Sequence, residues 1–355
     1  MIGTREKIAV VGCGEISDVY LKNFTSEFAD AVDVVAVCDT SETAAREKAS
    51  KYGIPRIIEY TELLSARDIP TIVNLTPAFL HFSLNSRAIA AGKNVYTEKI
   101  MASSYDEAAR LVITARNTGV KLGSAPDTIF GTGLRAASRI LESGTIGTIF
   151  GGEASIVMGS PMDSPHAGAD GFYREAGEPF PNMGVYYLTA LTHLLGPIRR
   201  IMGFTNTVTS TRTFTHASNP NHGKTIRISL PTAVAGSLEF ASGAIVTLSV
   251  TTESVGYYPR LVLYGTKGLL DAGDPNTFDS PVTIRDAEGR RRSVTADGGY
   301  KFDARGCGLI DLLKYPGRTG DPGSPAARAL HVVEAIYGMY NSADRGRAFT
   351  MTTLS

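Results

Sequence analysis

The chain has 355 residues, which is long enough for two domains that each bury a hydrophobic core, and its composition is ordinary for a globular protein. Basic and acidic residues balance at 35 each, so the chain carries no net field that would attract nucleic acid or an anionic membrane. With no secretory segment at the start and no apolar run long enough to span a bilayer, we expect a cytoplasmic protein that binds neither membranes nor nucleic acid.

The first third of the chain alternates strand-like and helix-like segments. Apolar runs predict strands at 7–11, 32–38, 71–75, 94–97 and 120–122, and helical patterns occupy 41–52, the stretch that runs to 91 after a turn at 76–77, and 105–117. Strands and helices that alternate at short spacing are typical of a parallel sheet with right-handed crossovers. Residues 1–123 are therefore predicted to form a doubly wound α/β domain.

The first of these strands ends in a glycine-rich turn that opens the next helix. The turn reads Gly12-Cys13-Gly14-Glu15-Ile16, and Ser17 takes the third small position of the G-x-G-x-x-G pattern. Glycine lets the backbone turn tightly and lets a pyrophosphate approach, where helix N–H groups stabilise the anion. The turn predicts dinucleotide binding, although a strand-to-helix turn can be rich in glycine without binding a ligand.

The second strand ends in Asp39-Thr40, about where the ribose-binding acid of a Rossmann domain lies. A carboxylate here accepts hydrogen bonds from both ribose hydroxyls and repels a 2′-phosphate, and no Arg or Lys follows directly. NAD is therefore favoured over NADP. The alternative is that Asp39 only caps the helix that begins near Ser41.

Glu98-Lys99 follows the strand at 94–97. Ligands of doubly wound sheets collect at the carboxyl ends of the strands, so Lys99 is placed to face the cofactor crevice. Its ammonium could stabilise a developing alkoxide or donate a proton. The alternative is that Glu98 and Lys99 form an ordinary surface pair.

Beyond residue 124 the pattern changes to long strands joined by turns. A helix is predicted at 133–142, and strands are predicted at 148–157, 201–209, 233–240, 244–252 and 261–264. Ala241-Ser242-Gly243 predicts a hairpin turn, 158–181 is irregular, and 271–299 reads as polar hairpins and loops. Residues 124–355 are therefore expected to form an α+β domain on an open, mostly antiparallel sheet. Its bare face favours a homo-oligomer, a dimer or a tetramer.

The chain contains three cysteines, Cys13, Cys38 and Cys307. They form neither a paired disulfide framework nor a metal-ligand spacing such as C-x-x-C. We expect small buried side chains and no metal site.

Taken together, several motifs resemble those of the Gfo/Idh/MocA family, which is named from glucose–fructose oxidoreductase and inositol dehydrogenase. They are Gly12-Cys13-Gly14, Asp39, Asn74-Leu75-Thr76-Pro77 with His81, Glu98-Lys99, Ile146-Gly147 and Asn182-Met183-Gly184. The resemblance implies an N-terminal Rossmann domain, a C-terminal open sheet, a nicotinamide cofactor and oxidation of a sugar or polyol carbinol. It also implies that the motifs of the first domain bind the cofactor and that Lys99 is catalytic.

The chain departs from the family pattern at two places. Ile100 replaces the proline of the family's Glu-Lys-Pro motif, and Asn182-x-x-x-Tyr186 replaces an Asp-x-Gly-x-His motif. An Asp-assisted histidine base is therefore absent. Tyr186 is one candidate proton acceptor, because the positive charges of Lys99 and oxidised nicotinamide would lower its pKa, and Lys99 is another. The alternative is that Tyr186 only packs in an amphipathic helix.

Three further residues are candidates for substrate contacts. Asp127 could accept hydrogen bonds from substrate hydroxyls or cap the next helix, and Asn182 could orient a hydroxyl. His166 lies in the irregular segment, where it could bind substrate, accept the proton or simply face solvent.

The sequence predicts an oxidoreductase that interconverts a secondary hydroxyl and a ketone on a sugar, glycoside or cyclitol by hydride transfer to NAD. Two alternatives stay open: an enzyme that recycles bound NAD while it cleaves a glycoside, and a sensor that binds NAD without turnover.

Overall fold

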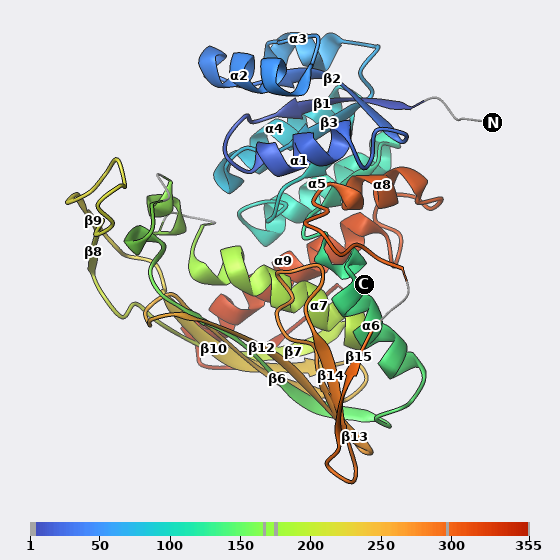
Figure 1. The fold of residues 1–355 in the computed structure, drawn as a ribbon, viewed down its shortest axis with the longest axis vertical. Coiled ribbons are helices and arrows are strands. Elements are labelled where there is room, and N and C mark those ends of the chain that lie inside the picture. Colours follow the sequence, from blue (N-terminus) through green and yellow to red (C-terminus); the bar gives the residue numbers. More distant parts are fainter. Residues whose placement is uncertain (1–4, 166–167, 174–176, 296–297, 354–355) are drawn as a thin grey trace. The chain divides into compact units, whose positions relative to one another are not determined.

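The computed structural model describes residues 5–165, 168–173, 177–295 and 298–353, and it divides the chain into two compact units (Figure 1). One unit comprises the residues up to 130 together with 302–333, and the other comprises 131–301 and 334–354. The sequence predicts a single boundary after residue 123. It does not predict that residues 302–333 return to the first unit.

The first unit is built on a five-stranded parallel sheet with the order β2-β1-β3-β4-β5. Its strands are β1 (Glu6–Val11), β2 (Val32–Cys38), β3 (Thr71–Asn74), β4 (Asn94–Thr97) and β5 (Leu122–Ser124). The four residues of β3 and the last four of β1 are all buried, as expected for strands covered on both faces. The predicted doubly wound sheet is confirmed.

Helices lie on both faces of this sheet (Figure 1). They are α1 (Ser17–Thr25), α2 (Glu42–Tyr52), α3 (Tyr60–Ser65), α4 (Ala78–Ala90), α5 (Tyr105–Thr118), the short η1 (Thr128–Phe130) and α8 (Cys307–Lys314). Ser41 and Ser104 accept hydrogen bonds from the first turns of α2 and α5, and the left-handed Gly53 and Gly119 end the same helices. These local signals explain why the predicted bounds of α2 and α5 hold to within one residue.

The second unit contains a nine-stranded sheet with the order β15-β14-β13-β12-β6-β11-β10-β7-β16. Only the pairing of β11 with β6 is parallel among the eight pairings of this sheet, so the expected open, mostly antiparallel sheet is confirmed. The strands are β6 (Ile149–Met158), β7 (Ile198–Asn206), β10 (Ala233–Phe240), β11 (Ile245–Thr251), β12 (Tyr257–Gly265), β13 (Gly268–Asp271), β14 (Val282–Asp286), β15 (Arg291–Val294) and β16 (Phe349–Thr350).

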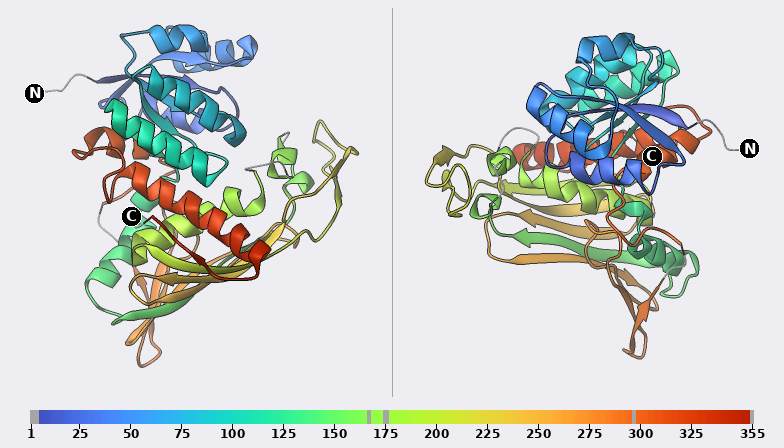
Figure 2. Two further views of the ribbon diagram at one scale, coloured as in Figure 1. Left: turned by 180° about the vertical axis from the view of Figure 1, so that it is seen from behind. Right: turned by 45° about the horizontal axis from the view of Figure 1, so that its top comes forward.

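In the described part of the chain, one face of this sheet carries helices and the other does not (Figure 2). The helices of the second unit are α6 (Thr132–Glu142), α7 (Val185–Leu195) and the later part of α9 (Pro325–Arg345). Val246, Leu248 and Val250 of β11 are buried, while Ile245 and Thr247, which alternate with them, are exposed. This period of two identifies a covered inner face and a bare outer face.

The irregular stretch after β6 has its own small core. It folds into the short turns η2 (Pro161–Asp163), η3 (Ala169–Tyr173) and η4 (Phe180–Gly184), beside the hairpin β8 (Thr211–Thr213) and β9 (Thr225–Arg227). Met162, Tyr173 and Phe214 pack together there, and the hydroxyls of Ser160 and Tyr173 lie 2.8 Å apart. No helix in the described part of the chain is long and apolar enough to cross a membrane.

Candidate active site

The glycine turn after β1 lies against the turn after β3. Gly12 has a φ of +97°, and a Cβ on this residue would lie 2.8 Å from the carbonyl carbon of Leu75 and 2.9 Å from the nitrogen of Thr76. Gly14 is exposed, and no heavy atom lies within 4 Å of the position its Cβ would take. Gly12 therefore permits the close approach of two loops, whereas Gly14 leaves open space in front of α1.

Asp39 extends from β2 toward the same turn. Its Oδ2 accepts a hydrogen bond from the Cys13 N–H, and its Oδ1 accepts one from the Ser41 N–H, both at 2.7 Å. The carboxylate thus joins the glycine turn to Ser41, the residue before α2, while the cap of α2 is the Ser41 side chain and not Asp39, which differs from the alternative given above. Each oxygen keeps a second lone pair, so the geometry still suits the ribose role. Thr40 beside it is exposed.

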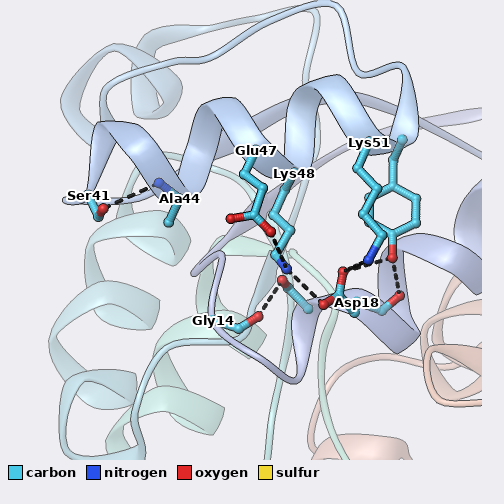
Figure 3. Close-up of polar contacts among 9 residues, drawn as sticks. Gly14, Asp18, Ser41, Ala44, Glu47, Lys48 and Lys51 are labelled. Atoms are coloured by element: carbon cyan, nitrogen blue, oxygen red, sulfur yellow. Dashed lines mark hydrogen bonds and ion pairs between the residues drawn. The ribbon is translucent and has the colours of Figure 1, made fainter. Parts of the chain in front are cut away.

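A cluster that the sequence analysis missed joins α1 to α2. Figure 3 shows Lys48 and Lys51 directed at Asp18, with Gly14 nearby, and the two Nζ atoms lie 2.8 and 2.9 Å from its carboxylate oxygens. Tyr52 donates a third hydrogen bond to Asp18 at 2.8 Å. Burial acts to raise the pKa of Asp18, but these three hydrogen bonds outweigh it and hold the pKa below its ordinary value.

The turn after β3 is organised by two asparagines. Asn74 Oδ1 accepts hydrogen bonds from the N–H and the hydroxyl of Thr76, at 3.1 and 2.7 Å. Asn74 Nδ2 donates to Asn85 Oδ1 of α4 at 2.8 Å. Leu75 is buried and Pro77 is exposed. Asn85 was not predicted, although its position four residues after His81 on a largely apolar helix was an available signal.

The loop after β4 presents Lys99 and is fixed by Glu98. Glu98 is buried, and its Oε1 accepts a hydrogen bond from the Tyr20 hydroxyl at 2.7 Å while its Oε2 accepts one from the Lys99 N–H at 2.9 Å. Glu98 therefore supports the loop from inside and does not form a surface pair. The peptide bond between Lys99 and Ile100 is cis.

The side chain of Lys99 is half-buried, and its surroundings weaken its hold on a proton. Burial lowers the pKa of Lys99 to about 8, with a further contribution from the Arg305 guanidinium, while the Glu98 carboxylate acts in the opposite direction. A lysine with this pKa can both stabilise a negative oxygen as an ammonium and exchange a proton near neutral pH. This electrostatic setting fits the catalytic role expected for Lys99.

His81 of α4 lies beneath the same loops. The ring is fully buried, its Nδ1 lies 2.6 Å from the Ile100 carbonyl oxygen, and its Nε2 lies 2.8 Å from that of Thr76. Burial lowers the pKa of His81, although both carbonyl contacts favour the protonated ring. We expected His81 to contact a cofactor, but a ring with no exposed surface supports the loops instead.

Asp127 is also buried. Its carboxylate accepts hydrogen bonds from the Tyr96 hydroxyl and, at 2.5 Å, from the Gly306 N–H. Burial raises the pKa of Asp127 to about 6, against the lowering effect of these hydrogen bonds. A Cβ on Gly308 would lie 2.3 Å from both Asp127 Oδ1 and the Tyr96 hydroxyl. Asp127 thus holds the returning segment 302–314 on the first unit, a role different from the expected contact with substrate hydroxyls.

The second unit carries the other predicted residues. Asn182 belongs to η4, a single π-type turn of a kind often found at functional sites, and Tyr186 follows one turn later in α7. Tyr186 is buried, and Asn182 Nδ2 lies 3.5 Å from the Gly177 carbonyl oxygen. His166 lies outside the described residues.

Tyr257 and Asp274 form a hydrogen-bonded pair in this unit that sequence reasoning missed. The Tyr257 hydroxyl donates to Asp274 Oδ2 at 2.7 Å, and the Asn276 N–H donates to Asp274 Oδ1 at 2.9 Å. Burial and this carboxylate raise the pKa of Tyr257 to about 12, with a contribution from Tyr186. The pair comes from β12 and the loop after β13, and no local motif marks it.

The first unit contains the parts that a dinucleotide needs. Because the sheet is parallel, the carboxyl ends of β1, β2, β3 and β4 share one edge, and the glycine turn, Asp39, the Thr76 turn and Lys99 follow those ends in turn. The exposed residues Gly14, Glu15 and Ile16 precede α1, whose first turn has no side-chain cap. An open glycine turn before a helix N-terminus fits a pyrophosphate.

The three cysteines are free and buried, as expected. Among the described residues, no group of three or more His, Cys, Asp or Glu side chains could hold a metal ion.

Comparison with known proteins matches both halves of the chain to one family. Residues 6–125 match the family model described as an oxidoreductase family with an NAD-binding Rossmann fold, and residues 134–271 match the model of the GFO/IDH/MocA C-terminal domain. The two matched ranges together include well over half of the chain.

Two relatives have names that describe reactions of sugars. The chain is 29% identical over 201 residues to dTDP-3,4-didehydro-2,6-dideoxy-alpha-D-glucose 3-reductase of Streptomyces violaceoruber, a match that covers 56% of each protein. It is 27% identical over 209 residues to D-apiose dehydrogenase of Paraburkholderia graminis, which covers 58% of this chain and 54% of the relative. The chain therefore spans about half the length of these relatives.

The fold also matches a solved structure of levoglucosan dehydrogenase in complex with NADH and levoglucosan. The TM-score is 0.81 at 15% sequence identity, and the match covers 99% of this chain and 100% of that chain. This likeness shows a shared fold.

Proposed function

Since the chain belongs to the Gfo/Idh/MocA family of oxidoreductases, we propose that it is an NAD-dependent enzyme that interconverts a secondary hydroxyl and a ketone on a sugar, glycoside or cyclitol. The observation that carries this proposal is the arrangement at one edge of the parallel sheet. There the open Gly14 turn and Asp39 follow β1 and β2, and Lys99, with a pKa near 8, follows β4. The names of the two relatives support a sugar as the substrate class.

The residues of the first unit would hold NAD. The Gly12–Ile16 turn and the N-terminus of α1 would bind the pyrophosphate, Asp39 and Thr40 the adenosine ribose, and the Asn74–Pro77 turn the nicotinamide half. When bound, NAD accepts the hydride that leaves the carbinol carbon. Asp39 favours NAD over NADP, because its carboxylate repels a 2′-phosphate and Thr40 and Ser41 supply no compensating charge.

Proton transfer is assigned to this chain's own residues. As the carbinol C–H bond breaks, the hydroxyl proton passes to Tyr186 Oη, and the Lys99 ammonium stabilises the negative charge on the substrate oxygen. Asn182 holds a neighbouring hydroxyl by hydrogen bonds. Asn182 and Tyr186 suit this joint role because they lie one helical turn apart.

A substrate panel tests the proposal. Sugars, anhydro sugars and inositols would be incubated with NAD or NADP while the absorbance of the reduced cofactor is followed. We expect turnover with NAD that Lys99→Ala abolishes and Tyr186→Phe lowers strongly. NAD binding without turnover across the panel would instead indicate a sensor, and glycoside cleavage without net cofactor reduction would indicate an enzyme that recycles its NAD.

We also propose that a second copy of the chain covers the outer face of the nine-stranded sheet. Phe204, Ile245 and Tyr258 on this face are 67, 55 and 61% exposed, which is unusual for a group of large apolar side chains on one sheet. Ion pairs of Glu239 with Arg199 and of Glu153 with Arg260 lie beside them. A mixed face of this kind can complement itself about a two-fold axis.

A further inference from the structure

His81 connects two loops that leave neighbouring strands. Its Nε2 lies 2.8 Å from the carbonyl oxygen of Thr76, in the turn after β3, and its Nδ1 lies 2.6 Å from that of Ile100, in the loop after β4. The ring has no exposed surface. A rigid planar ring that contacts both carbonyls limits the movement of one loop against the other.

The carbonyl of Ile100 belongs to the residue that follows Lys99. On the other side of Lys99, Glu98 accepts hydrogen bonds from the Lys99 N–H and from the Tyr20 hydroxyl. The backbone is thus held by Glu98 before the lysine and by His81 after it. Among the hydrogen bonds of the described residues, the His81 contacts are the ones that tie this loop to the Thr76 turn through a side chain of α4.

α4 holds the Thr76 turn a second time, through Asn85. Asn85 lies one helical turn after His81 and accepts a hydrogen bond from Asn74, which in turn accepts two from Thr76. The Thr76 turn is therefore fixed to α4 with or without His81. The Ile100 carbonyl has no such second link among the hydrogen bonds of the described residues, so loss of His81 should loosen the Lys99 loop more than the Thr76 turn.

A neutral imidazole carries one N–H, so it can donate to only one of these carbonyls at a time. The shorter contact is that of Nδ1 with Ile100. We propose that His81 is a positioning residue for Lys99, in which the Nδ1–H donates to the Ile100 carbonyl and fixes the loop that presents the lysine beside the Thr76 turn. This inference rests on the proposed function in assigning catalysis to Lys99.

Two amide substitutions can separate the two ring nitrogens. The side-chain nitrogen of Asn reaches about the position of histidine Nδ1, and that of Gln reaches about the position of Nε2. His81→Asn therefore keeps the donor toward Ile100, whereas His81→Gln keeps one toward Thr76 and His81→Leu keeps neither. Ile89→Ala is the matched control, because Ile89 is a buried residue of the same helix that contacts neither carbonyl through a polar atom.

The kinetic test compares kcat at saturating NAD and substrate, at a temperature where each variant is folded. We expect His81→Leu and His81→Gln to lower kcat by about 10- to 100-fold, as small misplacements of catalytic groups do. His81→Asn should restore kcat to within about threefold of the original, and the Kd for NAD should change by less than about threefold throughout. Equal losses in the Asn and Gln variants, or an equal loss in Ile89→Ala, would overturn the proposal.

Amide hydrogen exchange tests the same contact without substrate. Exchange in residues 98–101 should be faster in His81→Leu and His81→Gln than in His81→Asn, while exchange in residues 32–38 of β2 stays unchanged in all three. If Lys99→Ala retains full turnover, the proposed function fails although this exchange pattern persists. If residues 98–101 exchange alike in all variants, the positioning role itself is wrong. Should His81→Leu not fold, the Asn and Gln pair still decides the question.

Discussion

At the scale of single residues, the two glycines of the first turn have different tasks. Gly12 is required by the fold, since it has a positive φ and a Cβ would collide with the backbone of Leu75 and Thr76. Gly14 meets nothing within 4 Å. Both glycines belong to the same sequence motif. In the structure, Gly12 is needed for the fold, whereas Gly14 leaves room for a ligand.

Substitution by alanine is therefore expected to affect protein stability at Gly12 and NAD binding at Gly14. Gly12→Ala should lower the free energy of unfolding by about 3 kcal/mol, because it adds backbone strain and a steric clash. Gly14→Ala should change it by less than about 0.5 kcal/mol but weaken NAD binding by about 10-fold or more, because its methyl group occupies the space in front of α1. Urea denaturation and NAD titration measure the two effects. A Gly14→Ala variant that binds NAD normally would contradict the pyrophosphate assignment.

Asp39 predicts the choice of cofactor. Asp39→Ser removes the charge that repels a 2′-phosphate, so the ratio of the Kd values for NADP and NAD should fall by about 10- to 100-fold. Asp39→Asn is the control, because it also removes the charge but keeps an acceptor for the Cys13 or Ser41 N–H. Both variants should therefore shift the ratio, because both remove the charge. An unchanged ratio in both would show that Asp39 does not face the ribose.

The pKa of Lys99 determines how kcat should change on the alkaline side of its pH profile. Its pKa near 8 means that the ammonium predominates below pH 8 and is lost above it. If the ammonium stabilises the substrate oxygen, kcat should fall as the pH rises through about 8. In Lys99→Arg the charge persists, so the remaining activity should not fall there. An unchanged alkaline limb in Lys99→Arg would assign that limb to another group.

At the scale of elements, hydrogen bonds to Asp18 join α1 to α2 beside the glycine turn (Figure 3). Lys48 is buried, and its Nζ lies 2.8 Å from Asp18 Oδ2 and 3.8 Å from Glu47 Oε1. The sequence offered no signal for this cluster, because its members are separated by some thirty residues and become neighbours only when β1 and β2 pair.

The cluster predicts an acid-dependent loss of stability. The folded-state pKa of Asp18 lies below that of the unfolded chain, so its contribution is complete above about pH 4 and is lost as the pH falls below that value. Asp18→Asn should lower the free energy of unfolding by about 1 kcal/mol at pH 7, since the carboxylate is partly exposed to solvent screening, and by less at pH 3. Urea denaturation at both pH values measures this. Glu42→Gln, which removes an exposed ion pair with Arg46, should cost less than about 0.5 kcal/mol at either pH.

The predicted elements were most accurate where local chemistry sets the bounds. β4 was predicted without error, and the Ser242-Gly243 turn joins β10 to β11 as expected, with Gly243 at a φ of +88°. β7 begins at Ile198, three residues earlier than predicted, because its pairing with β10 extends to Phe240. α8 and α9 were not predicted at all. Their positions depend on packing against residues far away in sequence, which no local pattern reports.

In the candidate site, too, the features set by local sequence could be predicted and those set by distant packing could not. The glycine turn, Asp39, the Thr76 turn and Lys99 follow strand ends, and parallel pairing places strand ends at one edge, so sequence reasoning could group them. His81, Glu98 and Asp127 each have at least one partner in another segment of the chain: the Thr76 and Ile100 carbonyls for His81, the Tyr20 hydroxyl for Glu98, and the Tyr96 hydroxyl and Gly306 N–H for Asp127. Their supporting roles could therefore not be inferred from spacing.

At the scale of the whole molecule, the outer face of the nine-stranded sheet carries no helix among the described residues (Figure 2). Its strands alternate buried and exposed side chains, and the exposed set includes Phe204 and Ile245. The bare face was predicted from the long strands, but its apolar content becomes clear only from the register of β7, β10 and β11.

If two copies associate through this face, a single charged residue placed on it should weaken their association. Phe204→Arg should shift a dimer or tetramer toward smaller species, because it places a charge in the proposed apolar contact. Ile113→Arg is the control, since Ile113 is equally apolar and exposed but lies on α5 of the first unit. Sedimentation velocity measures both. If neither Phe204→Arg nor other substitutions on the outer face change the mass of the oligomer, the second copy does not bind to this face.

The return of residues 302–333 to the first unit also bears on how the protein is made. The chain passes between the units after residues 130, 301 and 333, so neither unit is a continuous stretch. On the ribosome, Asp127 and Tyr96 emerge long before Gly306, the backbone group that completes their hydrogen bonding. The fold of the nascent cofactor-binding unit therefore stays incomplete until every strand of the nine-stranded sheet except β16 has been synthesised. Any exchange of this half between relatives would have to move two separate gene segments together.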